Sequence, residues 1–74
     1  MKPVPTRQIH RILANRNCTL VGTEGSHEKW QTPGGITNTI VGGDKEQSAG
    51  LLRNLERVFE PEFGPKWLQK DLQR

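Results

Sequence analysis

Hydrophobic positions recur with a helical period in two parts of the chain. In residues 7–16, Ile9, Ile12 and Leu13 are spaced i, i+3, i+4, which places them on one side of a helix. Residues 49–59 form a second amphipathic stretch, whose apolar side holds Leu51, Leu52, Leu55, Val58 and Phe59. Each stripe is apolar on one side only, so we expect two surface helices that bury one face each.

Between these helices the pattern changes to short β-prone segments divided by turns. Gly25 and Ser26 indicate the first turn, because glycine supplies positive φ angles and serine bonds to local backbone. Pro33, Gly34 and Gly35 indicate the second. The connections are too short for the crossovers that parallel strands need, so we expect an antiparallel meander. Its strands are predicted at residues 18–23, 27–31 and 36–41.

Residues at the ends of the helices agree with these bounds. Thr6 and Ser48 are suited to the N-cap positions of the two helices, because a hydroxyl accepts a hydrogen bond from the free backbone N–H groups there. Asn15 and Asn17 tolerate the left-handed conformation that ends a helix. Pro61 is expected to end the second helix.

The tail after residue 59 predicts a short third helix. Gly64 precedes Pro65, which suits the first position of a helix because its missing N–H would have no partner there. Trp67, Leu68 and Leu72 form its apolar side. Two interpretations stay open: the helix packs on the core, or Trp67 makes a contact specific to a partner protein.

The order of elements predicts an α+β fold. Two helices should cover one face of a three-stranded antiparallel sheet and leave the other face open. This order resembles that of a double-stranded-RNA-binding domain, although many unrelated domains share it. Leu, Ile, Val and Phe make up 17 of the 74 residues, so we expect one small domain with a thin core. An active site on such a domain must be shallow.

Composition disfavours several classes of site. Cys18 is the single cysteine, which excludes an intramolecular disulfide, and with His10 and His27 it lacks the ligand number and spacing of a zinc site. We expect Cys18 to be buried and inert. No apolar run approaches the ~18 residues of a membrane span, and the N-terminal residues lack a signal-peptide pattern. A cytoplasmic, soluble protein without a metal or cofactor is expected.

Positive charge is concentrated near the N-terminus. The net charge is +3, and residues 1–20 contain Lys2, Arg7, Arg11 and Arg16 but no acidic residue. The three arginines would form a solvated helix face or contact the phosphates of a nucleic acid nonspecifically. His10, on the same helix, is expected to be exposed to solvent.

One short motif suggests chemistry. His27 follows Gly25 and Ser26 at the start of a predicted strand, and Lys29, two residues on, shares its face. A histidine that titrates near neutrality beside a cation is suited to cleaving RNA: the base takes the 2′-hydroxyl proton and the cation stabilises charge on the phosphate. The alternative is an exposed strand histidine with a solvated lysine nearby. Trp30 should face the core instead.

The wider sequence around this motif is similar to the HicA (YcfA-like) family of toxins. The similarity covers residues 5–59. We assign residues 1–59 to a HicA-like domain and residues 60–74 to a C-terminal extension of the same domain with a short amphipathic helix. The similarity rests on the Gly-Ser-His tripeptide, a Pro-Gly hairpin and a Lys-Glu loop before the second helix. The matching positions are Gly25, Ser26, His27, Trp30, Asp44, Lys45, Glu46, Ser48, Gly50, Leu52 and Arg53.

The resemblance implies a function. HicA-like proteins have a double-stranded-RNA-binding-like fold and cleave mRNA without a metal, with the histidine of the tripeptide, here His27, as the catalytic residue. Gly25, Ser26, Lys29 and Lys45 would then contact RNA. A HicB-type antitoxin would cover the site and build a higher-order complex.

This chain departs from the family in two places. Many members carry a proline and a second histidine after the third strand, where this chain has Val41-Gly42-Gly43. Many also enter the second helix with Pro-Gly-Thr-Leu, where this chain has residues 49–52. Two alternatives therefore stay open: an RNA-binding module that does not cleave, and a degenerate toxin that retains only antitoxin binding.

Overall fold

The three predicted strands form an antiparallel sheet in the order β2-β3-β4 in the computed structural model, which describes residues 1–73. They span β2 (Thr19–Glu24), β3 (His27–Gln31) and β4 (Thr37–Val41), each within one residue of its expected bounds. Two predicted helices are also present, as α1 (Thr6–Asn15) and α2 (Ala49–Phe63). The predicted α+β class and the antiparallel meander are confirmed.

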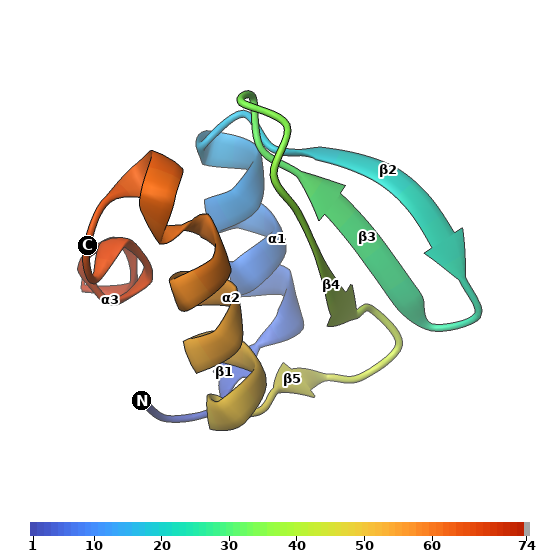
Figure 1. Cartoon of the computed structure of the whole chain (residues 1–74). Coiled ribbons are helices and arrows are strands. Elements are labelled where there is room, and N and C mark those ends of the chain that lie inside the picture. Colours follow the sequence, from blue (N-terminus) through green and yellow to red (C-terminus); the bar gives the residue numbers. More distant parts are fainter. Residues whose placement is uncertain (74) are drawn as a thin grey trace.

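Both long helices lie on one side of the sheet (Figure 1). The two apolar stripes provide most of the core, together with Ile40 of β4 on the covered face of the sheet. β2 makes no comparable contribution, because all six of its residues are exposed. The buried hydrophobic side chains are those of Val4, Ile9, Ile12, Leu13, Cys18, Ile40, Leu52, Leu55, Phe59, Trp67 and Leu68. The hairpin of β2 and β3 therefore projects from the core.

The N-cap expected at Thr6 is wrong. Thr6 is the first residue of α1, and its hydroxyl donates to the backbone carbonyl of Asp44 at 2.6 Å instead of capping the helix. This contact is favoured because a short sheet brings the two segments together: β1 (Val4–Pro5) pairs with β5 (Glu46–Gln47). The sequence analysis identified a Lys-Glu loop before the second helix but neither of these two short strands. The N-cap at Ser48 is confirmed, since its Oγ accepts from the Leu51 N–H at 3.2 Å.

Pro61 does not end the second helix, contrary to expectation. It lies inside α2, which continues to Phe63. Proline in the last turn removes only one backbone hydrogen bond, and the ring of Phe63 gains contacts with Phe59 and Trp67 at centroid distances of 5.8 and 5.0 Å. The helix ends at Gly64, whose φ of 92° few other residues adopt.

The third helix begins later than predicted. α3 spans Trp67–Leu72 and is preceded by Lys66 in the left-handed conformation, so Pro65 is not its first residue. Trp67 is only 1% exposed and its Nε1 donates to the Glu56 carbonyl at 2.9 Å, so it belongs to the core and is unavailable to a partner. Trp67 and Leu68 of the predicted 60–74 extension thus pack in the same hydrophobic core as α1 and α2. The last residue of the extension lies outside the described range.

Candidate functional site

The turn between β2 and β3 fixes the start of the Gly-Ser-His motif. Gly25 and Ser26 form a two-residue turn, with Glu24 and His27 paired across the hairpin. Gly25 has a φ of 60°, at the position where a type II′ hairpin turn carries its glycine. The hairpin therefore holds His27 at the first position of β3, at the end of the sheet.

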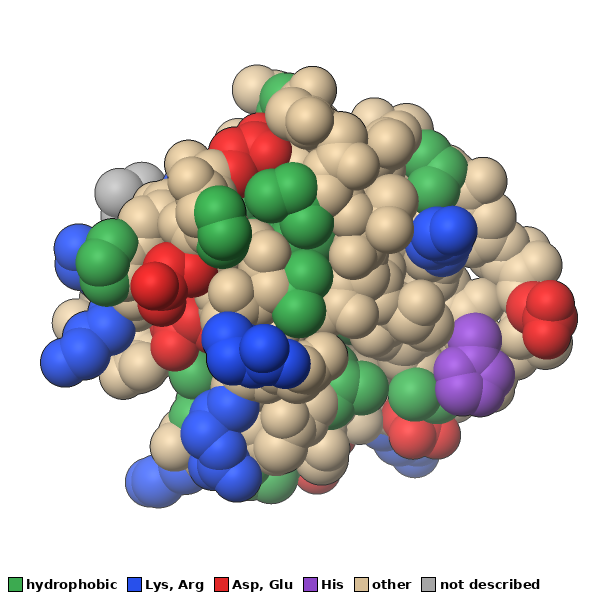
Figure 2. All heavy atoms as spheres, viewed as in Figure 1, with side chains coloured by type: hydrophobic (Ala, Val, Ile, Leu, Met, Phe, Trp, Pro, Cys, Tyr) green, Lys and Arg blue, Asp and Glu red, His purple; other side chains and the backbone are tan. Residues whose placement is uncertain are grey.

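His27 and Lys29 line one shallow hollow on the exposed face of the sheet. They alternate along β3 as predicted, and Gly22 of β2 and Thr39 of β4 flank Lys29 in the register. The hollow has a volume of about 370 Å³ and is lined by Gly22, Thr23, Glu24, His27, Lys29 and Thr39. Figure 2 shows a histidine on the face in view at the end of the sheet, with a basic and an acidic side chain beside it.

The chemistry available in this hollow is proton transfer next to a positive charge. An imidazole can act as general base or acid, and an ammonium group can stabilise a phosphate that gains negative charge. The ring of His27 is exposed and forms no hydrogen bond with any side chain or backbone group of residues 1–73. A substrate could therefore reach both ring nitrogens.

A second histidine, His10, lies on the opposite side of β3 and is not simply solvated as expected. Its Nε2 lies 2.7 Å from Oε1 of Glu28, and the same carboxylate oxygen accepts from Nε1 of Trp30 at 3.1 Å. The rings of His10 and Trp30 lie 5.7 Å apart. Trp30 thus faces the helices, as the alternation predicted. The sequence did hold a signal that His10 lies near the sheet: its i, i+3 spacing to Leu13 places it beside the apolar stripe of the helix.

The loop after β4 packs closely against the Gly-Ser-His turn. The Gly42 N–H donates to the Ser26 carbonyl at 2.7 Å. A Cβ atom on Gly42 would overlap the side chain of Glu28, and one on Gly43 would lie 2.9 Å from Cβ of Ser26. A side chain in the segment in which many HicA-like proteins carry a second histidine would therefore have to displace Glu28 or Ser26.

Lys45 does not join His27 and Lys29. It lines a separate hollow of about 700 Å³ between the start of α1 and the loop before β5. The other residues around this hollow are Pro5, Thr6, Arg7, His10, Gly42 and Glu46. Of the predicted RNA contacts, Gly25, Ser26 and Lys29 are therefore close to His27, and Lys45 lies with Arg7 and His10.

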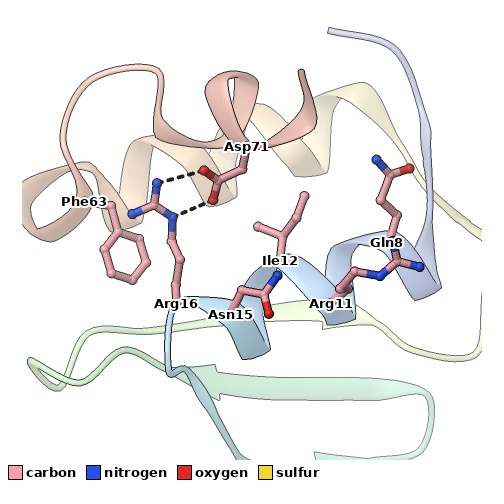
Figure 3. Close-up of a pocket in the computed structure, with 7 residues that line it drawn as sticks. All are labelled: Gln8, Arg11, Ile12, Asn15, Arg16, Phe63 and Asp71. Atoms are coloured by element: carbon pink, nitrogen blue, oxygen red, sulfur yellow. Dashed lines mark hydrogen bonds and ion pairs between the residues drawn. The ribbon is translucent and has the colours of Figure 1, made fainter. Parts of the chain in front are cut away.

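A third hollow, of about 410 Å³, lies between α1 and α3 (Figure 3). Arg16 crosses it and donates from Nε and Nη2 to the two carboxylate oxygens of Asp71, at 2.6 and 3.0 Å. Its guanidinium also lies over the rings of Phe63 and Trp67, at 4.8 and 5.2 Å from their centroids. Arg16 therefore joins α3 to α1 and is not a free phosphate contact.

Cys18 is buried, as expected, and burial raises the pKa of its thiol to about 11. A protonated thiol is a poor nucleophile. Within residues 1–73, no cluster of histidine, cysteine or acidic side chains could hold a metal ion. Nor is any helix in this range both long and apolar enough to cross a membrane.

Comparison with known proteins identifies no relative of this chain. Neither the family models nor the curated proteins nor the solved structures include a significant match to this chain.

Proposed function

We propose that this chain is the toxin of a HicAB-type toxin–antitoxin pair, a cytoplasmic endoribonuclease that cleaves mRNA and arrests growth. The observation that carries the proposal is the placement of His27 and Lys29 above one open hollow on the exposed face of β3. The sequence similarity to HicA-like proteins assigns the same histidine to catalysis. An open hollow is also what a long RNA requires, because a small domain cannot enclose it.

The proposed reaction is attack of a 2′-hydroxyl on the neighbouring phosphate. His27 takes the 2′ proton as the bond from the 2′-oxygen to phosphorus forms. Lys29 stabilises the negative charge on the phosphate oxygens. The bond from phosphorus to the 5′-oxygen then breaks, and this oxygen takes a proton from water. No step uses a metal ion.

The arrangement of elements is consistent with this assignment. An N-terminal helix, a three-stranded antiparallel meander and a long second helix follow one another in the order of a double-stranded-RNA-binding-like domain. We propose that the HicA-like chain folds in this way, with its site on the sheet face that the helices leave open.

A HicB-type antitoxin is the proposed partner. It would cover the hollow at His27, and the exposed hairpin beside the hollow offers it additional surface. Leu20 and Val21 of β2 are 43% and 46% exposed, unusual for large apolar side chains in this structure. Because the antitoxin would bind only the folded toxin, it would also stabilise this small domain.

Inducible expression tests the proposed function in cells. Wild-type protein should arrest growth, and His27→Ala should not, because the exposed ring contributes no hydrogen bond to the fold. Lys66→Ala, an exposed cation far from the sheet in sequence, is the control and should remain toxic. A His27→Ala variant that arrests growth as strongly as wild type, at equal protein level, would contradict the assignment.

One observation favours a second candidate, a degenerate toxin that only binds antitoxin. Nothing in residues 1–73 hydrogen-bonds to the His27 ring, whereas catalytic histidines are commonly oriented by another group. This candidate predicts tight antitoxin binding without growth arrest by the wild-type protein. An RNA-binding module that does not cleave would instead shift RNA in a gel and leave it intact.

A further inference from the structure

The hollow around Lys45 is built by contacts that join distant parts of the chain. The Thr6 N–H donates to the Lys45 carbonyl at 2.8 Å, and the Thr6 hydroxyl donates to the Asp44 carbonyl. Gln47, which is only 1% exposed, donates from Nε2 to the Thr6 hydroxyl at 2.7 Å. These bonds fix the loop before β5 against the first turn of α1. Lys45 and Arg7 are thereby held around the same hollow.

The two cations of this hollow have no acidic partner in the described chain. The ion pairs within residues 1–73 are His10 with Glu28 and Arg16 with Asp71. Glu46 also lines the hollow, but it does not approach Arg7 or Lys45 closely enough to form an ion pair. The positive charges of Arg7 and Lys45 are therefore available to an anionic ligand.

His10 adds an oriented ring to the same hollow. Its Nε2 faces the Glu28 carboxylate, which can only accept a hydrogen bond, so Nε2 carries a proton. Glu28 is itself held by Trp30 Nε1 and packs against Gly42. No described residue hydrogen-bonds to Nδ1, and no side-chain nitrogen of residues 1–73 is buried without a partner, so Nδ1 reaches solvent. Because Nε2 carries the proton, the neutral ring offers Nδ1 to a ligand as a hydrogen-bond acceptor.

This hollow lies next to the one at His27. Val41 pairs with His27 in the sheet, and Gly42, the following residue, lines the second hollow. The Gly42 N–H also donates to the Ser26 carbonyl, in the turn that carries His27. A strand bound at His27 can therefore continue around the end of β4 into the second hollow.

We propose that the hollow of Arg7, His10 and Lys45 is a binding site for a backbone phosphate of RNA, adjacent to the phosphate cleaved at His27. Arg7 and Lys45 contact the phosphate oxygens as cations, and His10, oriented by Glu28, lines the same hollow beside them. This site deepens the proposed function and rests on it. The hollow of Arg7, His10 and Lys45 contributes to RNA affinity, so the cleavage site at His27 needs few contacts of its own.

RNA affinity tests the site in a protein that cannot cleave. In a His27→Ala background, Lys45→Ala and Arg7→Ala should each weaken binding of a short single-stranded RNA about five- to tenfold at ~50 mM salt. Each should lower the slope of log affinity against log salt by about 0.7, the value for one phosphate contact on a single strand. Arg53→Ala, an exposed cation on α2, is the matched control. Losses no larger than that of Arg53→Ala would overturn the site.

A second measurement separates this site from the proposed cleavage. Inorganic phosphate added to the wild-type protein should shift the His10 ring signals in NMR spectra, and Lys45→Ala should weaken the response. Unmoved His10 signals at saturating RNA would overturn the site even if cleavage at His27 were demonstrated. If cleavage were absent but both RNA and phosphate moved His10 through Lys45, the proposed function would fail and the phosphate site would stand.

Discussion

The Nε2 atom of His10 and the Oε1 atom of Glu28 lie 2.7 Å apart and join α1 to β3. This contact distinguishes the two histidines of the chain. His10 is held on the covered side of the sheet, whereas His27, adjacent to Glu28 in sequence, points to the exposed side. Strand alternation places His27 and Glu28, the partner of His10, on opposite faces of β3, so the two histidines lie on opposite sides of the sheet.

Removing Glu28 should destabilise the fold. Its carboxylate accepts hydrogen bonds from His10 and Trp30, and both donors would lose their partner in Glu28→Ala. We expect the free energy of unfolding to fall by about 1–3 kcal/mol, measured by urea denaturation followed through tryptophan fluorescence. Glu24→Ala, an exposed acid on β2, should change it by less than about 0.5 kcal/mol. Equal effects of the two changes would contradict the role of Glu28.

Gln47 is the buried polar residue on which the start of α1 depends. Its Oε1 accepts from the Val41 N–H at 3.0 Å, and its Nε2 donates to the Val41 carbonyl and the Thr6 hydroxyl, both at 2.7 Å. Gln47→Leu should therefore leave the part-buried Val41 backbone groups without these partners and cost about 2–4 kcal/mol of unfolding free energy. Glu46→Leu, the exposed neighbour, is the control. A Gln47→Leu variant as stable as wild type would show that this network is dispensable.

Gly42 should not tolerate a side chain. A Cβ there would overlap the Glu28 carboxylate, so Gly42→Ala should displace Glu28 and lower stability by about 1–3 kcal/mol. Gly50→Ala provides an informative comparison, because a Cβ on Gly50 meets open space within α2. It should raise stability by about 0.5–1 kcal/mol. Thermal unfolding of the two variants should move in opposite directions, and a stabilised Gly42→Ala would refute the packing of this loop.

Cys18 should make stability depend on pH in the alkaline range. Its pKa is raised from 9.0 to about 11 in the folded protein, so above pH 9 the unfolded chain releases this proton more readily. Stability should therefore fall between pH 9 and pH 11, by on the order of 1–3 kcal/mol. Subtracting the pH profile of Cys18→Ala from that of wild type isolates this effect. A difference that stays constant across this range would contradict it.

The elements that the sequence predicted correctly are those with a local signal. The stripe of Ile9, Ile12 and Leu13 and the turn at Gly25 depend on spacing and on backbone preference, which a few neighbouring residues determine. The bounds of the three strands followed from the same signals.

The features that were missed depend on contacts between distant segments. Thr6 forms a hydrogen bond with Asp44, 38 residues away, so neighbouring residues could not predict that its hydroxyl makes a tertiary contact and does not cap the helix. Pro61 remains in α2 because Phe63 packs on Trp67, and His10 is held by Glu28 on another element. At the site, alternation predicted that His27 and Lys29 share a face. The sequence could not predict that Lys45 lies apart from them, because this depends on the path of the loop before β5 in three dimensions.

RNA cleavage by the purified protein is the most direct test of the central claim, that His27 is the catalytic residue of a ribonuclease. Wild-type protein should cut a single-stranded RNA in the presence of EDTA, and His27→Asn should reduce the rate at least about 100-fold while its circular dichroism and unfolding curve stay unchanged. Uncut RNA with the wild-type protein, or equal rates for wild type and a folded His27→Asn variant, would contradict the claim.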